Sequence, residues 1–348
     1  MAIPKKKLLI SDFLKLAEEY SVIDVRSPSE YKTGHIPGSV NIPIFDDLER
    51  AQVGIKYKNE GRISAILKGL ELSGPSMSQK LEKALKYNKN GKLLVHCWRG
   101  GMRSEAMAWL FSMADVETEI LDGGYKSFRH YVLEYLAEKR DYMILGGLTG
   151  TGKTQILKEM KNHNHQVIDL EAIACHRGSA FGSLGQQSQP TSEHFANLLF
   201  VELKKTDRNR PVWLEDESKN IGSVFLPDQF YFNMQDSPVV ALIMDVDTRM
   251  PRLLKEYSEF PREALKASIM KISKRLGGDN TKLALESIES ANFARAIEMT
   301  LNYYDKAYMF GLKRRHESLI RYVYTESDVV DLNINRILEA AALLRRAK

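Results

Sequence analysis

The sequence predicts an α/β protein with two parallel sheets and a helical region at its C-terminal end. Short apolar segments that are typical of buried strands alternate with segments of helical periodicity along most of the chain. Two of the strand-like segments run directly into glycine-rich turns, at 97–104 and at 146–154, and a predicted helix follows each turn. Because strands that alternate with helices favour parallel sheets covered on both faces, we expect two domains, 1–138 and 139–348.

The overall composition is that of a globular protein. The 348 residues are 43% hydrophobic and 27% charged, and no apolar run reaches the roughly eighteen residues that a membrane span needs. The apolar stretch near the N-terminus is too short for a signal peptide, so we expect a cytoplasmic location. Two cysteines are too few for a disulfide framework and instead predict thiol chemistry in a reducing compartment. The net charge of +5 leans mildly toward an anionic partner.

The first half is predicted to alternate short strands with helices. A helix from Ser11 to Glu19 would be capped by Ser11 or Asp12. Segment 27–43, rich in proline and glycine, is predicted to be a loop, and 45–74 to be partly helical. Asp24 and Arg26 are candidates for a catalytic role, but they are more simply a structural pair that fixes this loop. The remaining predicted elements are strands at 22–25, 93–96 and 119–122 and helices at 78–87, 104–113 and 125–140.

Cys97 lies at the end of a predicted strand, in the turn before a helix. The adjacent Gly100 and Gly101 allow the backbone to curl with successive N–H groups pointing inward. Such a turn at a helix N-terminus binds an anion and lowers the pKa of a thiol. Arg99 and Arg103 add positive charge, which favours a catalytic thiolate over a small buried structural cysteine. The predicted anion loop consists of Trp98, Arg99, Gly100, Gly101, Met102 and Arg103.

Three motifs in this half resemble those of a rhodanese domain and span about residues 8–135. They are Asp24-Val25-Arg26, the Gly34 to Ser39 stretch and the Cys97 loop. The resemblance implies a cysteine that carries sulfur as a persulfide. Common single-domain rhodaneses have Cys-x-x-Gly-x-Arg, whereas Arg103 here lies six positions after Cys97. This is the spacing of a Cdc25-like phosphatase loop, a wider cradle that can hold a tetrahedral anion, so a phosphatase stays open for this half.

The second half begins with a Walker A motif. A predicted strand at 142–145 precedes Gly147-x4-Gly152-Lys153-Thr154, and a helix follows. The glycines let the backbone wrap a phosphate, Lys153 can bridge its oxygens, and Thr154 can hold magnesium. The predicted phosphate-binding residues are Gly147, Thr149, Gly150, Thr151, Gly152, Lys153 and Thr154.

Acidic side chains follow one of the later strands. Strands are predicted at 167–170, 211–214 and 239–246, and the chain after Phe260 is predicted to be almost wholly helical. Glu215 and Asp216 come directly after the second of these strands. An acid at such a strand end can orient magnesium or water in a P-loop protein, although an acidic helix cap is an alternative.

A glycine-rich loop and two basic clusters are candidates for binding RNA. Loop 176–186 combines small residues with a cation, an aromatic ring and amides, which is typical of a flexible binding loop. Its candidate residues are His176, Arg177, Gly178, Ser179, Phe181 and Gln186. Phe181 and Gln186 are predicted to contact an RNA base. The clusters at 271–275 and 313–316 are predicted to contact RNA phosphates, Lys274 and Arg275 above all; the alternative is a solvated face.

The two halves together resemble the bacterial tRNA 2-selenouridine synthase family over essentially the whole chain. The Cys97 loop, the Walker motif and segments 176–179, 214–218 and 275–278 carry the resemblance. It implies replacement of the sulfur of 2-thiouridine at the tRNA wobble position, U34, by selenium, in the tRNAs for lysine, glutamate and glutamine. Geranyl diphosphate would first alkylate the sulfur. Selenophosphate, from selenophosphate synthetase, would then supply selenium through a selenylated Cys97. Magnesium is a candidate cofactor, and no tightly bound organic cofactor is expected.

Three other functions stay open at this point. A Cdc25-like phosphatase with a fused kinase-like domain predicts release of phosphate from aryl phosphates. A rhodanese-type sulfurtransferase driven by ATP or GTP predicts tight nucleotide binding and hydrolysis, although the sequence shows no clear adenine or guanine reader. A non-catalytic RNA-binding regulator predicts that the Cys97→Ala variant keeps its function.

Overall fold

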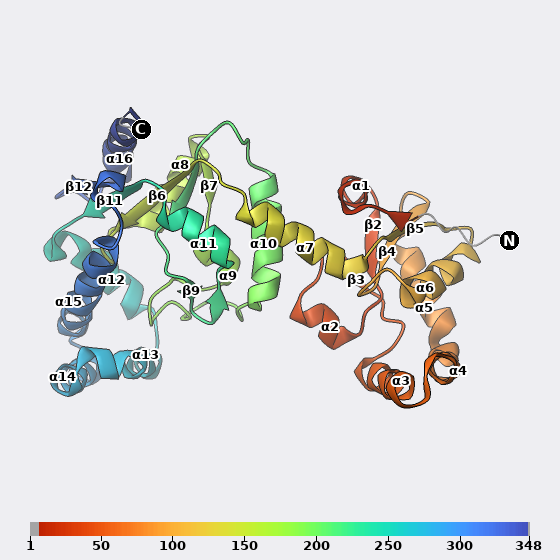
Figure 1. Ribbon diagram of the computed structural model, residues 1–348. Coiled ribbons are helices and arrows are strands. Elements are labelled where there is room, and N and C mark those ends of the chain that lie inside the picture. Colours follow the sequence, from red (N-terminus) through yellow and green to blue (C-terminus); the bar gives the residue numbers. More distant parts are fainter. Residues whose placement is uncertain (1–6, 347–348) are drawn as a thin grey trace. The chain divides into compact units, whose positions relative to one another are not determined.

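The computed structural model describes residues 7–346, which divide into two compact units. The first comprises the described residues up to Tyr135 together with Ala196–Leu198, and the second comprises Leu136–Phe195 and the chain from Leu199 onward. The division falls within helix α7 (Gly124–Ala137). Figure 1 shows a sheet with its own helices in each unit. Within residues 7–346, no helix is both long and apolar enough to cross a membrane.

The first unit contains a five-stranded parallel sheet with the order β1-β5-β4-β2-β3. Because all its strands are parallel, their carboxyl ends meet at one edge, where Asp24 of β2 pairs in register with His96 of β4. Helices α5 and α6 cover one face, and Phe111 of α6 packs in the same core as Ile23 and Val95. The strands are β1 (Lys7–Leu8), β2 (Ser21–Asp24), β3 (Val40–Asn41), β4 (Lys92–His96) and β5 (Glu117–Leu121).

The helices of this unit correct two sequence predictions. Helix α1 begins at Ile10 after Leu9, with no side-chain cap, so the predicted cap at Ser11 or Asp12 is wrong. The predicted loop 27–43 contains a helix, α2, whose capping box pairs the Ser27 and Glu30 side chains with each other's backbone. The helices are α1 (Ile10–Leu16), α2 (Pro28–Thr33), α3 (Asp47–Glu60), α4 (Arg62–Ser73), α5 (Met77–Tyr87), α6 (Met102–Ser112) and α7, with a 3₁₀ turn at Gly74–Ser76.

The second unit is built on a five-stranded parallel sheet with the order β12-β11-β6-β8-β7. Strand β12 lies in the region predicted to be almost wholly helical, and it pairs with β11 along its full length. Its Ile-Arg-Tyr-Val-Tyr sequence is rich in β-branched and aromatic residues, which explains the strand. The strands are β6 (Tyr142–Gly147), β7 (Gln166–Ile168), β8 (Val212–Glu215), β11 (Val239–Ile243) and β12 (Ile320–Tyr324), with a separate hairpin of β9 (Asn220–Ile221) and β10 (Val224–Phe225).

Helices of this unit pack in two separate apolar cores. Helices α8 and α16 pack their apolar faces on the sheet, with Ile156 and Ile337 in one core with Leu145 and Leu242. Helices α13, α14 and α15 share a second core. The helices are α8 (Lys153–Asn162), α9 (Leu170–Ala174), α10 (Ser192–Lys204), α11 (Asp228–Gln235), α12 (Val246–Ser258), α13 (Arg262–Leu276), α14 (Gly278–Glu289), α15 (Phe293–Leu312) and α16 (Val330–Arg346), with a 3₁₀ turn at Glu317–Leu319.

Candidate active sites

The Cys97 loop joins the carboxyl end of β4 to the first turn of α6 and is braced by the turn before α7. Gly100 has a φ of +64°, and a Cβ there would overlap the carbonyl oxygen of Leu121. Gly124 has a φ of +60°, and a Cβ there would overlap the carbonyl oxygen of Cys97. The amide of Tyr125 donates to that carbonyl at 2.8 Å. Two backbone turns therefore meet at a distance that only glycine permits, which fixes the loop around the thiol.

The Cys97 thiol is buried and electrostatically favoured as a thiolate. Its side chain is 3% exposed, and Sγ lies 3.4 Å from Oγ of Ser104 on α6. Burial raises the pKa of the Cys97 thiol, but the Ser104 hydroxyl, the charge of Arg103 and the backbone N–H of Arg99 outweigh burial and lower it below the usual value. A thiol with a lowered pKa is a nucleophile near neutral pH.

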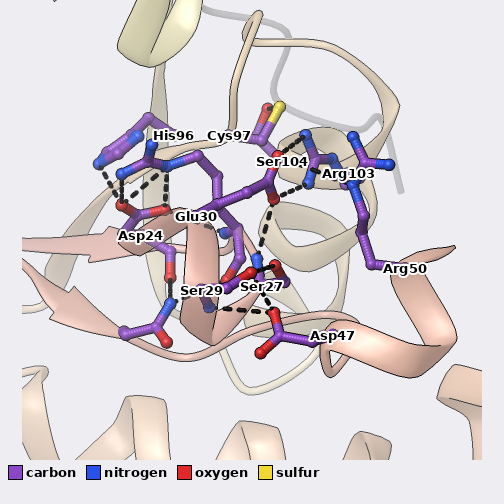
Figure 2. Close-up of polar contacts among 12 residues, drawn as sticks. Asp24, Ser27, Ser29, Glu30, Asp47, Arg50, His96, Cys97, Arg103 and Ser104 are labelled. Atoms are coloured by element: carbon purple, nitrogen blue, oxygen red, sulfur yellow. Dashed lines mark hydrogen bonds and ion pairs between the residues drawn. The ribbon is translucent and has the colours of Figure 1, made fainter. Parts of the chain in front are cut away.

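Arg103 is held at the loop by Glu30 of α2. Its Nη1 donates to Oε2 of Glu30 at 2.7 Å, and the same carboxylate accepts the Ser27 amide that it caps. Arg50 of α3 lies 3.8 Å from Oε1 of Glu30, so the Glu30 carboxylate faces two arginines (Figure 2). Burial raises the pKa of Glu30, and the Arg103 hydrogen bond and charge more than offset it, so the carboxyl has a lowered pKa. Glu30 of the α2 capping box thus also orients Arg103 of the Cys97 loop.

The predicted pairing of Asp24 with Arg26 is present in the structure. Both side chains are buried, and Arg26 donates from Nε and Nη2 to the Asp24 carboxylate at 2.6–3.0 Å. Its Nη2 also donates to the carbonyl of Gly34 at 2.7 Å, which ties the 27–43 segment to the strand end. The Arg26 guanidinium stacks on the ring of Tyr125, 3.7 Å from its centroid.

The Walker segment forms a closed turn between β6 and α8. Gly150 and Gly152 have φ values of +83° and +80°, which glycine adopts without strain. Lys153 Nζ donates to the carbonyls of Gly147 at 3.2 Å and Leu148 at 3.3 Å. The Thr151 hydroxyl donates to the Leu148 carbonyl at 2.9 Å, inside the turn. The predicted phosphate-binding residues are therefore contiguous around one helix N-terminus, which favours an anion.

A carboxylate cluster lies beside Thr154. The Thr154 hydroxyl oxygen is 3.2 Å from Glu215 Oε2 and 3.3 Å from Glu171 Oε2, and Lys153 Nζ is 3.5 Å from Glu215 Oε1. One oxygen from each of Glu171, Glu215 and Glu217 lies within 4.8 Å of the others. Burial and the neighbouring carboxylates raise the pKa of Glu171 to about 8, and burial raises the pKa of Glu215 and of Glu217 as well. Such groups hold protons unless a cation neutralises them.

Of the two acids predicted after β8, only Glu215 joins this cluster. Asp216 accepts from Arg315 at 2.8 and 2.9 Å and from the Tyr308 hydroxyl at 3.2 Å. Successive side chains of an extended segment point to opposite sides, so Glu215 and Glu217 face the cluster and Asp216 does not. The prediction of Asp216 as a site acid is therefore corrected. Arg315 of the second basic cluster is 9% exposed and paired with Asp216, so its predicted contact with an RNA phosphate is corrected.

Glu171 and Glu217 were not among the predicted site residues. Glu171 lies in the first turn of α9, two residues after the Asp169 cap, and its burial could not be predicted from one sequence. The pattern Glu215-Asp216-Glu217 did contain a usable signal, because alternate residues after a parallel strand share one side.

Loop 176–186 lies against the carboxylate cluster. A Cβ at Gly178 would lie 2.9 Å from Glu171 Oε1 and 3.2 Å from the Glu217 carboxylate, so the backbone there touches the acids. Arg177 pairs with Glu256 of α12. His176 is 8% exposed, and burial and the charge of Lys271 lower its pKa. Ser179 Oγ accepts the Phe181 amide at 3.2 Å.

The two candidate base contacts in this loop differ. Phe181 is 6% exposed and packs its ring on Tyr257, with ring centroids 4.8 Å apart. Its ring belongs to the core of α13–α15 and is not available to stack on a base, which corrects that prediction. Gln186 is half-buried, and Lys274 and Arg275, in the last turn of α13, are exposed.

Comparisons with known proteins agree with both halves. Residues 140–336 match the family described as the tRNA 2-selenouridine synthase AAA domain, and residues 9–131 match the rhodanese-like domain. A tRNA 2-selenouridine synthase of Nitrosomonas europaea is 32% identical, over 84% of this chain and 89% of its own length. Those of Shewanella pealeana and Pseudomonas putida are 35% identical, over 88–89% of this chain and 92% of their own lengths. Because both domains match and these relatives align along most of their length, the chain belongs to the tRNA 2-selenouridine synthase family.

Proposed function

We propose that this protein is a cytoplasmic transferase that converts 2-thiouridine to 2-selenouridine at the wobble position of tRNA. The observation that carries the proposal is the presence of two different anion loops in one chain of this family. One lowers the pKa of the Cys97 thiol, and the other presents Lys153 and Thr154 beside buried carboxylates. We propose the tRNAs for lysine, glutamate and glutamine as substrates, and selenophosphate synthetase as the source of the selenium donor.

The P-loop residues suit the first step, transfer of a geranyl group from geranyl diphosphate to the thiouridine sulfur. In this step the carbon–oxygen bond of the diphosphate ester breaks as the sulfur–carbon bond forms, and diphosphate leaves. Backbone N–H groups of the Gly147–Lys153 turn would hold the diphosphate. The Lys153 ammonium would stabilise the negative charge that develops on the leaving group. Alkylation turns the sulfur into a better leaving group for the second step.

The carboxylate cluster fits a hard divalent cation. Its donors are all oxygens, from Glu171, Glu215, Glu217 and the Thr154 hydroxyl, and Mg²⁺ prefers such donors. Their raised pKa values reflect carboxylates crowded together with one lysine as the neighbouring cation. Thr154 and Glu215 would hold the ion, which, when bound, neutralises charge on the diphosphate.

The Cys97 loop suits the second step, delivery of selenium from selenophosphate. Selenophosphate is a tetrahedral anion, and the seven-residue loop from Cys97 to Arg103 offers N–H groups and the Arg103 guanidinium to hold it. The Cys97 thiolate would attack the phosphorus of selenophosphate, so that a sulfur–phosphorus bond forms as the phosphorus–selenium bond breaks and selenium leaves as selenide. Selenide would then add to C2 of the base, and the S-geranyl group would leave as geranylthiolate; water would release phosphate from Cys97.

Holding the tRNA is proposed for exposed cations on the second unit. Lys274 and Arg275 project from the last turn of α13, where they can contact backbone phosphates without reading sequence. Gln186 remains the proposed amide contact to the base, now without Phe181.

Nucleoside mass spectrometry of tRNA from a strain that lacks the gene tests the proposal. We expect 2-selenouridine to be absent, 2-thiouridine to persist, and the intact gene to restore the selenonucleoside. Normal 2-selenouridine in the deletion strain would exclude the proposed function.

A further inference from the structure

One face of α12 packs on the P-loop. This face places Arg252, a cation in addition to Lys153, next to the loop. Leu253 packs against Gly150, where an added Cβ would lie 2.8 Å from the leucine side chain. Arg249, Arg252 and Glu256 lie at helical spacing on this face. Arg249 donates to the Thr149 carbonyl at 2.8 Å, and Glu256 pairs with Arg177. The helix therefore contacts both the P-loop and the 176–186 loop.

The two arginines of this face have different surroundings. Arg249 is 2% exposed, and Asp305 of α15 neutralises it through two hydrogen bonds of 2.6 and 3.0 Å. Arg252 is half-buried and has no carboxylate partner among residues 7–346; its one polar contact is the Gly150 carbonyl, 3.4 Å from Nη1. A Cβ on Gly152 would overlap the Arg252 guanidinium. An uncompensated guanidinium thus lies directly over the last glycine of the P-loop.

The charges around the P-loop indicate a binding role for the Arg252 guanidinium. Lys153 is 3.5 Å from Glu215, so the ammonium that meets the diphosphate is shared with a carboxylate. A diphosphate brings several negative charges of its own, and guanidinium matches its paired oxygens in a bidentate manner. We propose that Arg252 is a diphosphate-binding residue that, with Lys153, holds the phosphate groups of the prenyl substrate from the α12 side. The inference rests on the proposed function, since it assigns a further residue to the same substrate.

Binding of inorganic pyrophosphate to the full-length protein with Mg²⁺, measured by calorimetry, tests this assignment apart from activity. We expect Arg252→Ala to weaken pyrophosphate binding by about 10- to 100-fold, the range of one charge-assisted hydrogen bond. Arg252→Lys keeps the charge without the planar fork and should lie between Ala and the wild type. Lys255→Ala, an exposed cation on the same helix, is the matched control and should bind as the wild type does.

Two further variants separate the ways in which the assignment can fail. Arg252→Gln keeps a donor for the Gly150 carbonyl but removes the charge, and it should bind as weakly as Arg252→Ala. Wild-type affinity in Arg252→Gln or Arg252→Ala, with weakened binding in Lys153→Ala, would overturn the role of Arg252 while leaving the P-loop as the diphosphate site. Unchanged affinity in Lys153→Ala as well would overturn the diphosphate site itself.

Discussion

The Cys97 loop and the P-loop use the same backbone device with opposite charge balance. Each joins the end of a parallel strand to a helix through a turn that contains left-handed glycines. At the first loop the one acid, Glu30, pairs with two arginines, Arg103 and Arg50, and the Cys97 thiol has a lowered pKa. At the second, Lys153 faces three buried glutamates whose pKa values are raised.

Because of this difference in charge, we expect the two loops to bind an anion under different conditions. The Cys97 loop already favours an anion, because its cations and N–H groups stabilise a thiolate or a tetrahedral oxyanion. We expect the P-loop to bind an anion more tightly when a divalent cation accompanies it, because the carboxylates would otherwise repel phosphate. The two sites therefore differ in their expected response to divalent cations and to pH.

Lys153→Ala should have the largest effect on the P-loop side of this comparison. Under the proposed function the Lys153 ammonium stabilises the departing diphosphate, so its removal should lower transfer of labelled geranyl by about 10²- to 10³-fold. Lys158→Ala, an exposed lysine on the same helix, should transfer geranyl at the wild-type rate. If Lys153→Ala were equally active, the P-loop would not be the diphosphate site.

Ser104→Ala should sharpen the comparison on the thiolate side. The Ser104 hydroxyl contributes to lowering the pKa of Cys97, so its removal should move the pH profile of Cys97 alkylation to higher pH. At pH 7 we expect about 3- to 10-fold slower labelling by iodoacetamide, followed by peptide mass spectrometry to separate Cys97 from Cys175. Ser112→Ala, on the same helix, is the control and should keep the wild-type profile. An unchanged pH profile in Ser104→Ala would mean that the Ser104 hydroxyl does not lower the pKa of Cys97.

Removal of divalent cations should make the stability of the folded protein fall as the pH rises. With EDTA present, folded Glu171 keeps its proton up to about pH 8, whereas the unfolded chain releases it near the ordinary value of 4.5. A raised pKa in the folded state means that its stability falls as pH rises between these values. We expect Tm to decrease from pH 5 to pH 8, by about 2–4 °C for each 1 kcal/mol of destabilisation.

Excess Mg²⁺ at pH 8 should restore this stability, and Glu171→Gln should reduce the slope of Tm with pH. A Tm that is independent of pH and of Mg²⁺ would contradict the cation requirement of the P-loop site.

The smallest expected effect concerns tRNA binding. The double variant Lys274→Ala, Arg275→Ala removes two exposed cations, so the slope of log affinity against log salt should decrease by about one unit for each tRNA phosphate that is no longer neutralised. A double variant of matched charge on α5, Lys83→Ala with Lys86→Ala, should keep the wild-type slope. Identical slopes for the wild type and the two double variants would mean that neither pair of cations contacts tRNA phosphates.

Patterns local in the chain predicted most of the longer sheet strands and both glycine loops. They could not predict distant partners. Glu215 and its neighbour Asp216 have different partners, because Asp216 pairs with Arg315 and Tyr308. These two residues lie about a hundred positions away along the chain. Phe181 was misassigned because a ring in a glycine-rich loop looks exposed until Tyr257 and α13–α15 are placed around it. Strand β12 was missed because a long helical region surrounds a segment of only five residues.

The central claim is that the two loops catalyse two separable steps, and nucleoside analysis of the Cys97→Ser variant tests it most directly. Serine is a far weaker nucleophile than a thiolate at neutral pH, so the selenium step should stop while the P-loop step continues. After incubation of thiolated tRNA with geranyl diphosphate and selenophosphate, we predict accumulation of S-geranyl-2-thiouridine and no 2-selenouridine. Formation of 2-selenouridine by Cys97→Ser at the wild-type rate, or the absence of the geranylated nucleoside, would contradict the account.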